Sequence, residues 1–185
     1  MKHIPNALSA LRILLIPFFV YLMMQNQSPL AGLVLVISGI TDLLDGFLAR
    51  SFNWTSQLGK ILDPVADKLT QAAVCIVMII KLRYYWPFFA ILLAKDLIML
   101  LAGGLLIHKG IKLEGARWFG KTSTLVFYVT MITVIFIPDM PKGVILFLLA
   151  VTTLSAVSAA LMYLPELQLY IQSLNTKKTE TETEG

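Results

Sequence analysis

The sequence predicts an all-α, polytopic membrane protein with six transmembrane helices. Of its 185 residues, 57% are hydrophobic and only 14% are charged, whereas about 25% of the residues in an ordinary soluble domain are charged. Apolar stretches close to the 20 residues that cross a bilayer recur along the chain. We therefore expect residues 1–174 to form one six-helix membrane domain.

The six predicted spans follow one another through short connections. They run from Leu8 to Met24, from Leu30 to about Leu44 with a continuation into the aspartate-containing segment that follows, from Val65 to Ile80, from Trp86 to Ile107, from Thr122 to Ile137 and from Gly143 to Leu164. Gln25–Pro29 and Pro138–Pro141 are short and rich in turn residues, so the spans that they join should be antiparallel neighbours. No small-x-small cleavage site follows the first apolar stretch, so we expect a retained helix and not a signal peptide.

The remaining composition narrows the class further. Residues 175–185 contain no apolar side chain and are expected to be a disordered polar tail. Cys75 is the only cysteine, which excludes a disulfide within the chain. The net charge of +4 reflects Lys and Arg residues around the spans, and we expect no nucleic-acid binding.

Lys and Arg residues are distributed unequally between the two ends of the predicted spans. One end carries Lys2, Arg12, Arg50, Lys60, Lys68, Lys109, Lys112, Arg117, Lys121, Lys177 and Lys178; the other carries Lys81, Arg83 and Lys142; Lys95 lies within the fourth span. Because cytoplasmic loops are enriched in Lys and Arg, both termini and the connection between the second and third spans should face the cytoplasm.

Four aspartates lie within 26 residues of this apolar chain. They form the frame Asp42-x2-Asp45-Gly46-x2-Ala49-Arg50-x8-Gly59-x3-Asp63-x3-Asp67. A carboxylate at the bilayer centre costs roughly 2.5–3.5 kcal/mol on insertion scales, so water, cations or a metal should compensate these groups. On helices, spacings of three and four residues place side chains on one face. The frame is therefore the predicted functional site.

Carboxylate oxygens favour Mg²⁺, Mn²⁺ or Ca²⁺ over Zn²⁺, and His3 and His108 stand alone. Two such metals about 3.5–4 Å apart suit displacement at phosphorus, so the expected ligand is a phosphate ester or a diphosphate. Asp63 either caps a helix that begins at Pro64 or lies inside a longer helix that Pro64 kinks.

This frame resembles, at every position, the signature of the CDP-alcohol phosphatidyltransferases, an integral membrane family of phospholipid biosynthesis. Asn6-x2-Ser9-x2-Arg12-x4-Pro17 and the segment from Gly59 to Lys68 are most similar to bacterial phosphatidylglycerophosphate synthases, where Thr is usual at the position of Ser9. The resemblance implies the family's six-helix bundle, located in the bacterial cytoplasmic (inner) membrane among membrane lipids, with a cytoplasmic active site and a homodimer.

The resemblance also implies residue roles. Asp42, Asp45, Asp63 and Asp67 would hold two Mg²⁺ or Mn²⁺ ions, with Asp63 and Asp67 catalytic and Asp67 as the base. Asp42, Gly46, Ala49, Arg50 and Gly59 would bind the CDP group. The implied reaction transfers a phosphatidyl group from CDP-diacylglycerol to glycerol 3-phosphate, giving phosphatidylglycerophosphate and CMP.

The acceptor phosphate would need a cationic pocket, for which Arg12, Lys95, Arg117 and Lys121 are candidates. Alternatively, Lys95 and Asp96 form a structural ion pair, and Arg117 and Lys121 anchor the chain or bind anionic lipid. Glycerophosphate-using members commonly carry an Arg-Glu pair at the Lys95-Asp96 position, and cardiolipin synthases often carry Arg-Asp. A cardiolipin synthase that uses phosphatidylglycerol is the alternative, and an ion transporter or an inactive scaffold is more remote.

Overall fold

The computed structural model describes residues 4–52, 57–108 and 117–162, without the side chains of residues 4–6, 45–51, 57–61, 63, 101–108 and 117–119. The described chain is helical and has no strand. Its helices are α1 (Ile4–Met24), α2 (Ser28–Ser51), α3 (Gln57–Lys81), the 3-10 helix η1 (Arg83–Tyr85), α4 (Trp86–His108), α5 (Arg117–Phe136) and α6 (Lys142–Leu161). The predicted tail, residues 175–185, lies outside the described residues.

Each predicted span lies on one of the six α-helices, which confirms the all-α bundle. The largest difference is at the start of α3, which begins at Gln57 and not at Val65, whereas α2 continues into the aspartate frame, to Ser51, as predicted. Pro64 lies inside α3, so the alternative in which Asp63 caps a helix at Pro64 is wrong. The first connection is also shorter than predicted, since α2 begins at Ser28 and Asn26 makes the turn with a φ of +59°.

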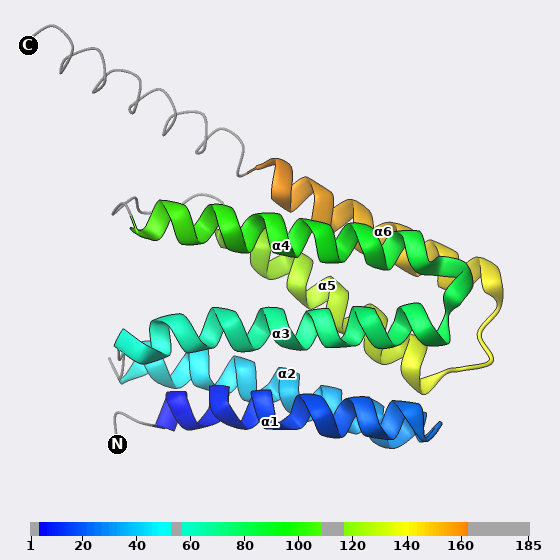
Figure 1. The fold of residues 1–185 in the computed structure, drawn as a ribbon, viewed down its shortest axis with the longest axis horizontal. Helices are drawn as coiled ribbons and strands as arrows, with labels where there is room; N and C mark the ends of the chain where they lie inside the picture. The colour runs from blue at the N-terminus through cyan, green and yellow to red at the C-terminus, as the bar shows by residue number, and fades with distance from the viewer. Residues whose placement is uncertain (1–3, 53–56, 109–116, 163–185) are drawn as a thin grey trace, which may run out of the picture.

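The six helices form a ring in which each packs mainly against two neighbours. Going around the ring, the order is α1, α2, α5, α6, α4 and α3, and α3 then closes onto α1. Figure 1 shows the helices running lengthwise between the two ends of the bundle. One end holds the start of α1, and the other holds the three turns that join α1 to α2, α3 to α4 and α5 to α6. The last turns of α2 and α4 and the first turns of α3 and α5 lie at the same end as the start of α1.

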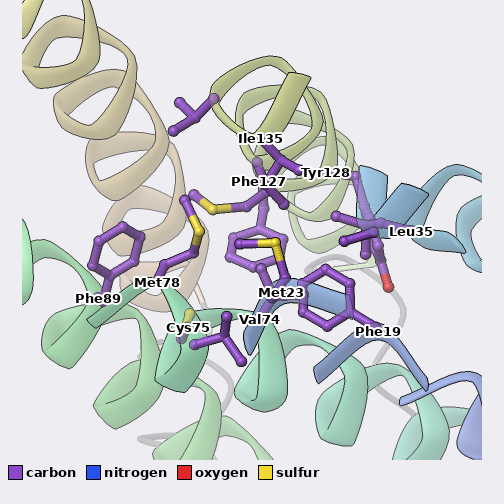
Figure 2. Packing of buried hydrophobic residues seen from close by; sticks show 14 of the residues in the cluster. Phe19, Met23, Leu35, Val74, Cys75, Met78, Phe89, Phe127, Tyr128 and Ile135 are labelled. Atoms are coloured by element: carbon purple, nitrogen blue, oxygen red, sulfur yellow. The ribbon is translucent and has the colours of Figure 1, made fainter. Parts of the chain in front are cut away.

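The interior of the ring is divided along its length. The half near the three turns holds a buried apolar cluster from all six helices, including Phe19, Met23, Leu35, Phe89 and Met131. Figure 2 shows these aromatic, aliphatic and thioether side chains meeting between the helices. Buried polar and charged side chains occur in the other half, at Arg12, Gln71 and Asp96. Burial of the apolar cluster thus holds together the helices that position the polar half.

The outer surface of the bundle is also apolar. On α1 the residues Leu11, Leu14, Phe18 and Tyr21 are exposed at helical spacing, and α2, α4 and α6 carry similar exposed residues. A helix that is apolar on its outward and inward faces is typical of a membrane span. This pattern agrees with the expected membrane bundle.

Within the described residues, α6 and the stretch Ala7–Met24 of α1 are long and apolar enough to cross a membrane. Pro64–Lys81 and Arg83–Leu100 pass the same test as a pair, with a bend of 119° between them. Ser28–Leu44 and Gly120–Phe136 are shorter apolar helices.

Candidate active site

Four charged side chains from four helices form one polar layer inside the ring. Arg12 lies on α1, Asp42 on α2, Asp67 on α3 and Asp96 on α4. At 1.5 Å per residue, each lies between about 12 and 18 Å from the end of its helix that shares the end of the bundle where the chain starts. The layer therefore lies within the length of the helices and not at their ends.

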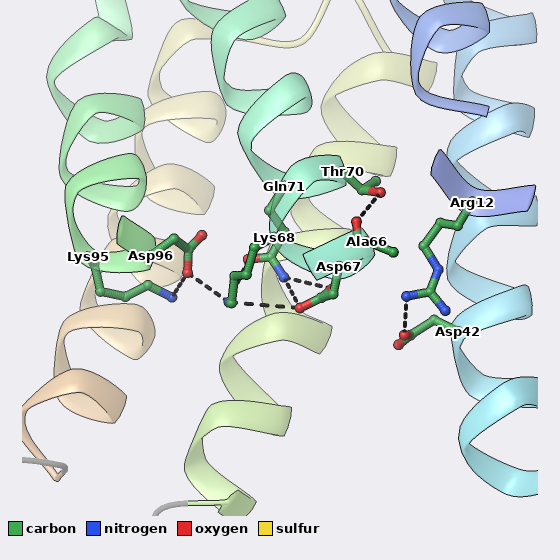
Figure 3. Close-up of polar contacts among 9 residues, drawn as sticks. All are labelled: Arg12, Asp42, Ala66, Asp67, Lys68, Thr70, Gln71, Lys95 and Asp96. Atoms are coloured by element: carbon green, nitrogen blue, oxygen red, sulfur yellow. Dashed lines mark hydrogen bonds and ion pairs between the residues drawn. The ribbon is translucent and has the colours of Figure 1, made fainter. Parts of the chain in front are cut away.

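The first contact in this layer joins α1 to α2. Arg12 is fully buried, and its Nη1 atom lies 2.7 Å from Oδ1 of Asp42, whose side chain is 31% exposed. A buried guanidinium needs a partner, because an uncompensated buried charge is strongly destabilising. The pair consequently fixes the position of the Asp42 carboxylate relative to α1 (Figure 3).

Asp67 is held by its own helix. The amide nitrogen Nε2 of Gln71 lies 2.9 Å from both carboxylate oxygens of Asp67, since residues four apart on a helix share a face. The ammonium group of Lys68 lies 3.8 Å from Asp67 and 3.4 Å from Oε1 of Gln71. Asp67 is thus oriented by an amide and accompanied by a cation.

The same lysine connects α3 to α4. Lys68 donates a hydrogen bond of 2.9 Å to Oδ1 of Asp96, and Nζ of Lys95 lies 2.7 Å from the same oxygen. One carboxylate therefore receives two ammonium groups, as Figure 3 shows, with Asp67 close by. The predicted ion pair of Lys95 and Asp96 is present, and Lys68 joins it.

These groups form one electrostatic unit. The charges of Lys68, Asp42 and Arg12 all act on the carboxylate of Asp67. The chemistry of the set suits a hard divalent cation, because Asp42 and Asp67 supply carboxylate oxygens. Arg12 and Gln71 hold those carboxylates in the way that outer contacts orient metal ligands. Within the described residues no three acidic, histidine or cysteine side chains are grouped as metal ligands, so only the chemistry of the Asp42 and Asp67 carboxylates is compatible with the expected metal.

Some predicted site residues cannot be placed beyond their backbone. Asp45, Gly46, Ala49, Arg50, Gly59, Asp63 and Arg117 lie on helices, but their side chains are outside the described set. Lys121 is exposed on α5. Among the predicted residues, Arg12 pairs with Asp42. Asp67 lies beside Lys68, and Lys95 contacts Asp96, which Lys68 also contacts.

Lys68 and Gln71 are site residues that the sequence analysis did not single out. Lys68 appears in the sequence only as one of the positive charges at the end of the spans and as the last residue of the family-like segment from Gly59, with no role of its own. The signal for Gln71 was its spacing of four residues after Asp67. The contact of Lys68 with Asp96, across 28 residues of sequence, depends on how α3 packs against α4.

Fold and site together define an α-helical membrane bundle with an acidic, cation-lined layer inside it. The sequence profile of the CDP-alcohol phosphatidyltransferase family matches residues 2–164. The chain belongs to this family, as the frame from Asp42 to Asp67 indicates.

Individual relatives carry two different names. A Mycobacterium tuberculosis protein named "Putative cardiolipin synthase" is 35% identical over 71% of this chain and 64% of its own length. The chain thus matches less than two thirds of that relative. Proteins named CDP-diacylglycerol--glycerol-3-phosphate 3-phosphatidyltransferase from Haemophilus influenzae and Salmonella paratyphi A are 33% and 31% identical. The alignments cover 66% and 80% of this chain and 69% and 86% of those relatives.

Proposed function

We propose that this protein is a membrane phosphatidyltransferase that transfers the phosphatidyl group of CDP-diacylglycerol to an acceptor alcohol and releases CMP. The observation that carries the proposal is the placement of Asp42 and Asp67, the first and last aspartates of the family frame. They come from α2 and α3, and both are partly buried and lie beside cations at a similar depth in the bundle. Membership of the family supports the same reaction class.

In the proposed reaction the acceptor hydroxyl attacks the phosphorus that carries diacylglycerol. A new bond forms between that oxygen and phosphorus, the bond from phosphorus to the CMP oxygen breaks, and CMP leaves with the electron pair. The acceptor proton passes to a carboxylate oxygen of Asp67. Gln71 donates to both of these oxygens at 2.9 Å, which holds the carboxylate in one orientation.

Asp42, Asp45, Asp63 and Asp67 would hold two Mg²⁺ or Mn²⁺ ions, which supply charge neutralisation for the diphosphate when bound. On the side of the protein, Arg12 keeps Asp42 in place. Its full burial and its contact with Asp42 support a positioning role for Arg12 more than direct contact with an acceptor phosphate. Gly46, Ala49, Arg50 and Gly59 would bind the CDP group.

The proposed acceptor is glycerol 3-phosphate. Its phosphate needs cations close to Asp67, and Lys68 and Lys95 meet at Asp96 within this layer. Lys121 and Arg117 lie on the first two turns of α5 and would extend the same cationic region. The relatives named as glycerol-3-phosphate phosphatidyltransferases support this acceptor.

Phosphatidylglycerol is the second candidate acceptor, because the mycobacterial relatives are named "Putative cardiolipin synthase". It also carries a phosphate, so the Lys68 and Lys95 ammonium groups suit it too. Its acyl chains would have to enter from the lipid.

The deciding experiment is CMP release by purified protein in detergent, with CDP-diacylglycerol, Mg²⁺ or Mn²⁺ and each acceptor in turn. Release that requires glycerol 3-phosphate supports the first assignment, and release that requires phosphatidylglycerol replaces it with the second. No release with either acceptor would overturn the proposed function. Lys95→Met should raise KM for the phosphorylated acceptor and leave KM for CDP-diacylglycerol unchanged.

A further inference from the structure

The hydroxyl group of Tyr128 on α5 is buried in the bundle without a partner. Tyr128 is 8% exposed, and among the described residues no protein group makes a hydrogen bond to its Oη atom. A buried hydroxyl left unsatisfied costs roughly 1–3 kcal/mol. A partner from outside the protein, either solvent or substrate, is therefore expected for this group.

Tyr128 belongs to the buried apolar cluster and lies at its border with the polar layer. It is eleven residues from Arg117, the start of α5, which at 1.5 Å per residue is about 16 Å from that end of the helix. The charges of Asp67, Asp42, Arg12 and Asp96 all act on its phenol group. Tyr128 thus adds α5 to the four helices that supply the charged residues of the site.

The tyrosine ring reaches α2 close to the aspartate frame. A Cβ atom added at Gly39 would lie 4.0 Å from Cδ1 of Tyr128, so the ring covers α2 one turn before Asp42. In Figure 2 Tyr128 projects from α5 towards Leu35 of α2. Packing against α2 fixes the ring, and its hydroxyl group is held close to the charged layer.

We propose that Tyr128 is a substrate-binding residue whose hydroxyl donates a hydrogen bond to a phosphate oxygen of the substrate held between Asp42 and Asp67. The inference rests on the proposed function. Asp42 already contacts Arg12, and both oxygens of Asp67 accept from Gln71. A neutral phenol in this layer adds a donor for an anionic oxygen without adding charge.

A bridging water is the competing explanation, and it fits Ser38 better than Tyr128. The Ser38 hydroxyl is also buried without a hydrogen-bond partner among the described residues. A cavity of about 10 Å³ is lined by Ser38, Thr70 and six apolar residues of α1, α2 and α3, which is close to the space for one water. Tyr128 does not line this cavity, so a water there would leave the Tyr128 hydroxyl unsatisfied.

The test compares Tyr128→Phe with Tyr85→Phe, two changes that each remove one buried phenol oxygen. Tyr85 donates to the carbonyl oxygen of Lys142 at 3.0 Å, near the turns at the opposite end of the bundle. We expect Tyr128→Phe to lower kcat/KM by about tenfold, which corresponds to about 1.4 kcal/mol, and Tyr85→Phe to change only the melting temperature. A rise in KM for CDP-diacylglycerol places the contact on the diphosphate, and a rise in KM for the acceptor places it on the acceptor phosphate.

A binding measurement makes the test independent of turnover. CDP with Mn²⁺ should raise the melting temperature of the wild-type protein, and it should raise that of Tyr128→Phe by clearly less. Unchanged kinetics and unchanged nucleotide stabilisation in Tyr128→Phe would overturn the inference. It would also be overturned if Tyr128→Phe only lowered the melting temperature, by as much as Ser38→Ala does, and left the kinetics unchanged. If the wild type releases no CMP with any acceptor but CDP stabilises it through Tyr128, the proposed reaction fails and the phosphate contact stands.

Discussion

At the residue scale, the orientation of Asp67 by Gln71 leads to a direct prediction for catalysis. Asp67→Asn should lower CMP release by at least about a hundredfold, because an amide cannot take the proton of the acceptor hydroxyl. Asp139→Asn is the matched control, since Asp139 is exposed in the connection between α5 and α6 at the other end of the bundle. Initial rates with saturating substrates measure both variants, and a fully active Asp67→Asn protein would exclude Asp67 as the base.

The pair of Arg12 and Asp42 gives a prediction for stability. Breaking a fully buried ion pair costs about 3–5 kcal/mol. Because the Asp42 side chain is 31% exposed, Arg12→Gln should lower the free energy of unfolding by less, about 1–3 kcal/mol. Adding Asp42→Asn should cost less than the sum of the two single changes, because the two groups compensate each other. Lys81→Gln is the control, since Lys81 bonds Asn26 only at an exposed site. Denaturant unfolding in detergent measures the cycle, and strict additivity would mean that the pair contributes nothing.

At the scale of helices, Gly32 allows α2 to approach α5. A Cβ atom at this position would lie 2.7 Å from Cε2 of Phe136, so Gly32→Ala should lower the melting temperature through overpacking, which typically costs 1–3 kcal/mol. Truncating the ring with Phe136→Ala in the same protein should remove most of the clash. Gly143→Ala is the matched control, since a Cβ there meets no atom within 4 Å. Equal melting temperatures for the two glycine variants would contradict this account of the α2–α5 contact.

Helix α3 shows how far local sequence can predict an element. The spacing of Gly59, Asp63 and Asp67 predicts a single stripe if the segment is helical, and the backbone from Gln57 to Lys81 is helical. Its beginning was predicted eight residues too late, at Val65, because the charged residues before Val65 lower the local hydropathy. Pro64 is not the first residue of the helix, because residues 57–63 before it are already helical.

At the scale of the whole molecule, the sequence predicted the six α-helices, but not the ring order in which they pack. Asp42 and Asp67 could be named as candidate site residues because they belong to one short motif of the sequence. Lys68 and Tyr128 belong to the layer only because α3 packs against α4 and α5 packs against α2. Contacts of this kind depend on tertiary packing, and periodicity along one helix carries no information about which helix lies opposite.

The charge asymmetry of the whole chain predicts its orientation in the membrane. Positive charges are enriched at the end with the α2–α3 junction, so this end should be cytoplasmic and the three turns should face outward. Asn26→Cys and Asp139→Cys should react with a membrane-impermeant maleimide in intact cells, while Phe52→Cys should react only after permeabilisation. Cys75 is fully buried, so the wild-type protein is the unlabelled control. Labelling of Phe52→Cys alone in intact cells would reverse the orientation and place the active site outside the cytoplasm, away from a cytoplasmic supply of nucleotide-activated lipid and phosphorylated acceptor.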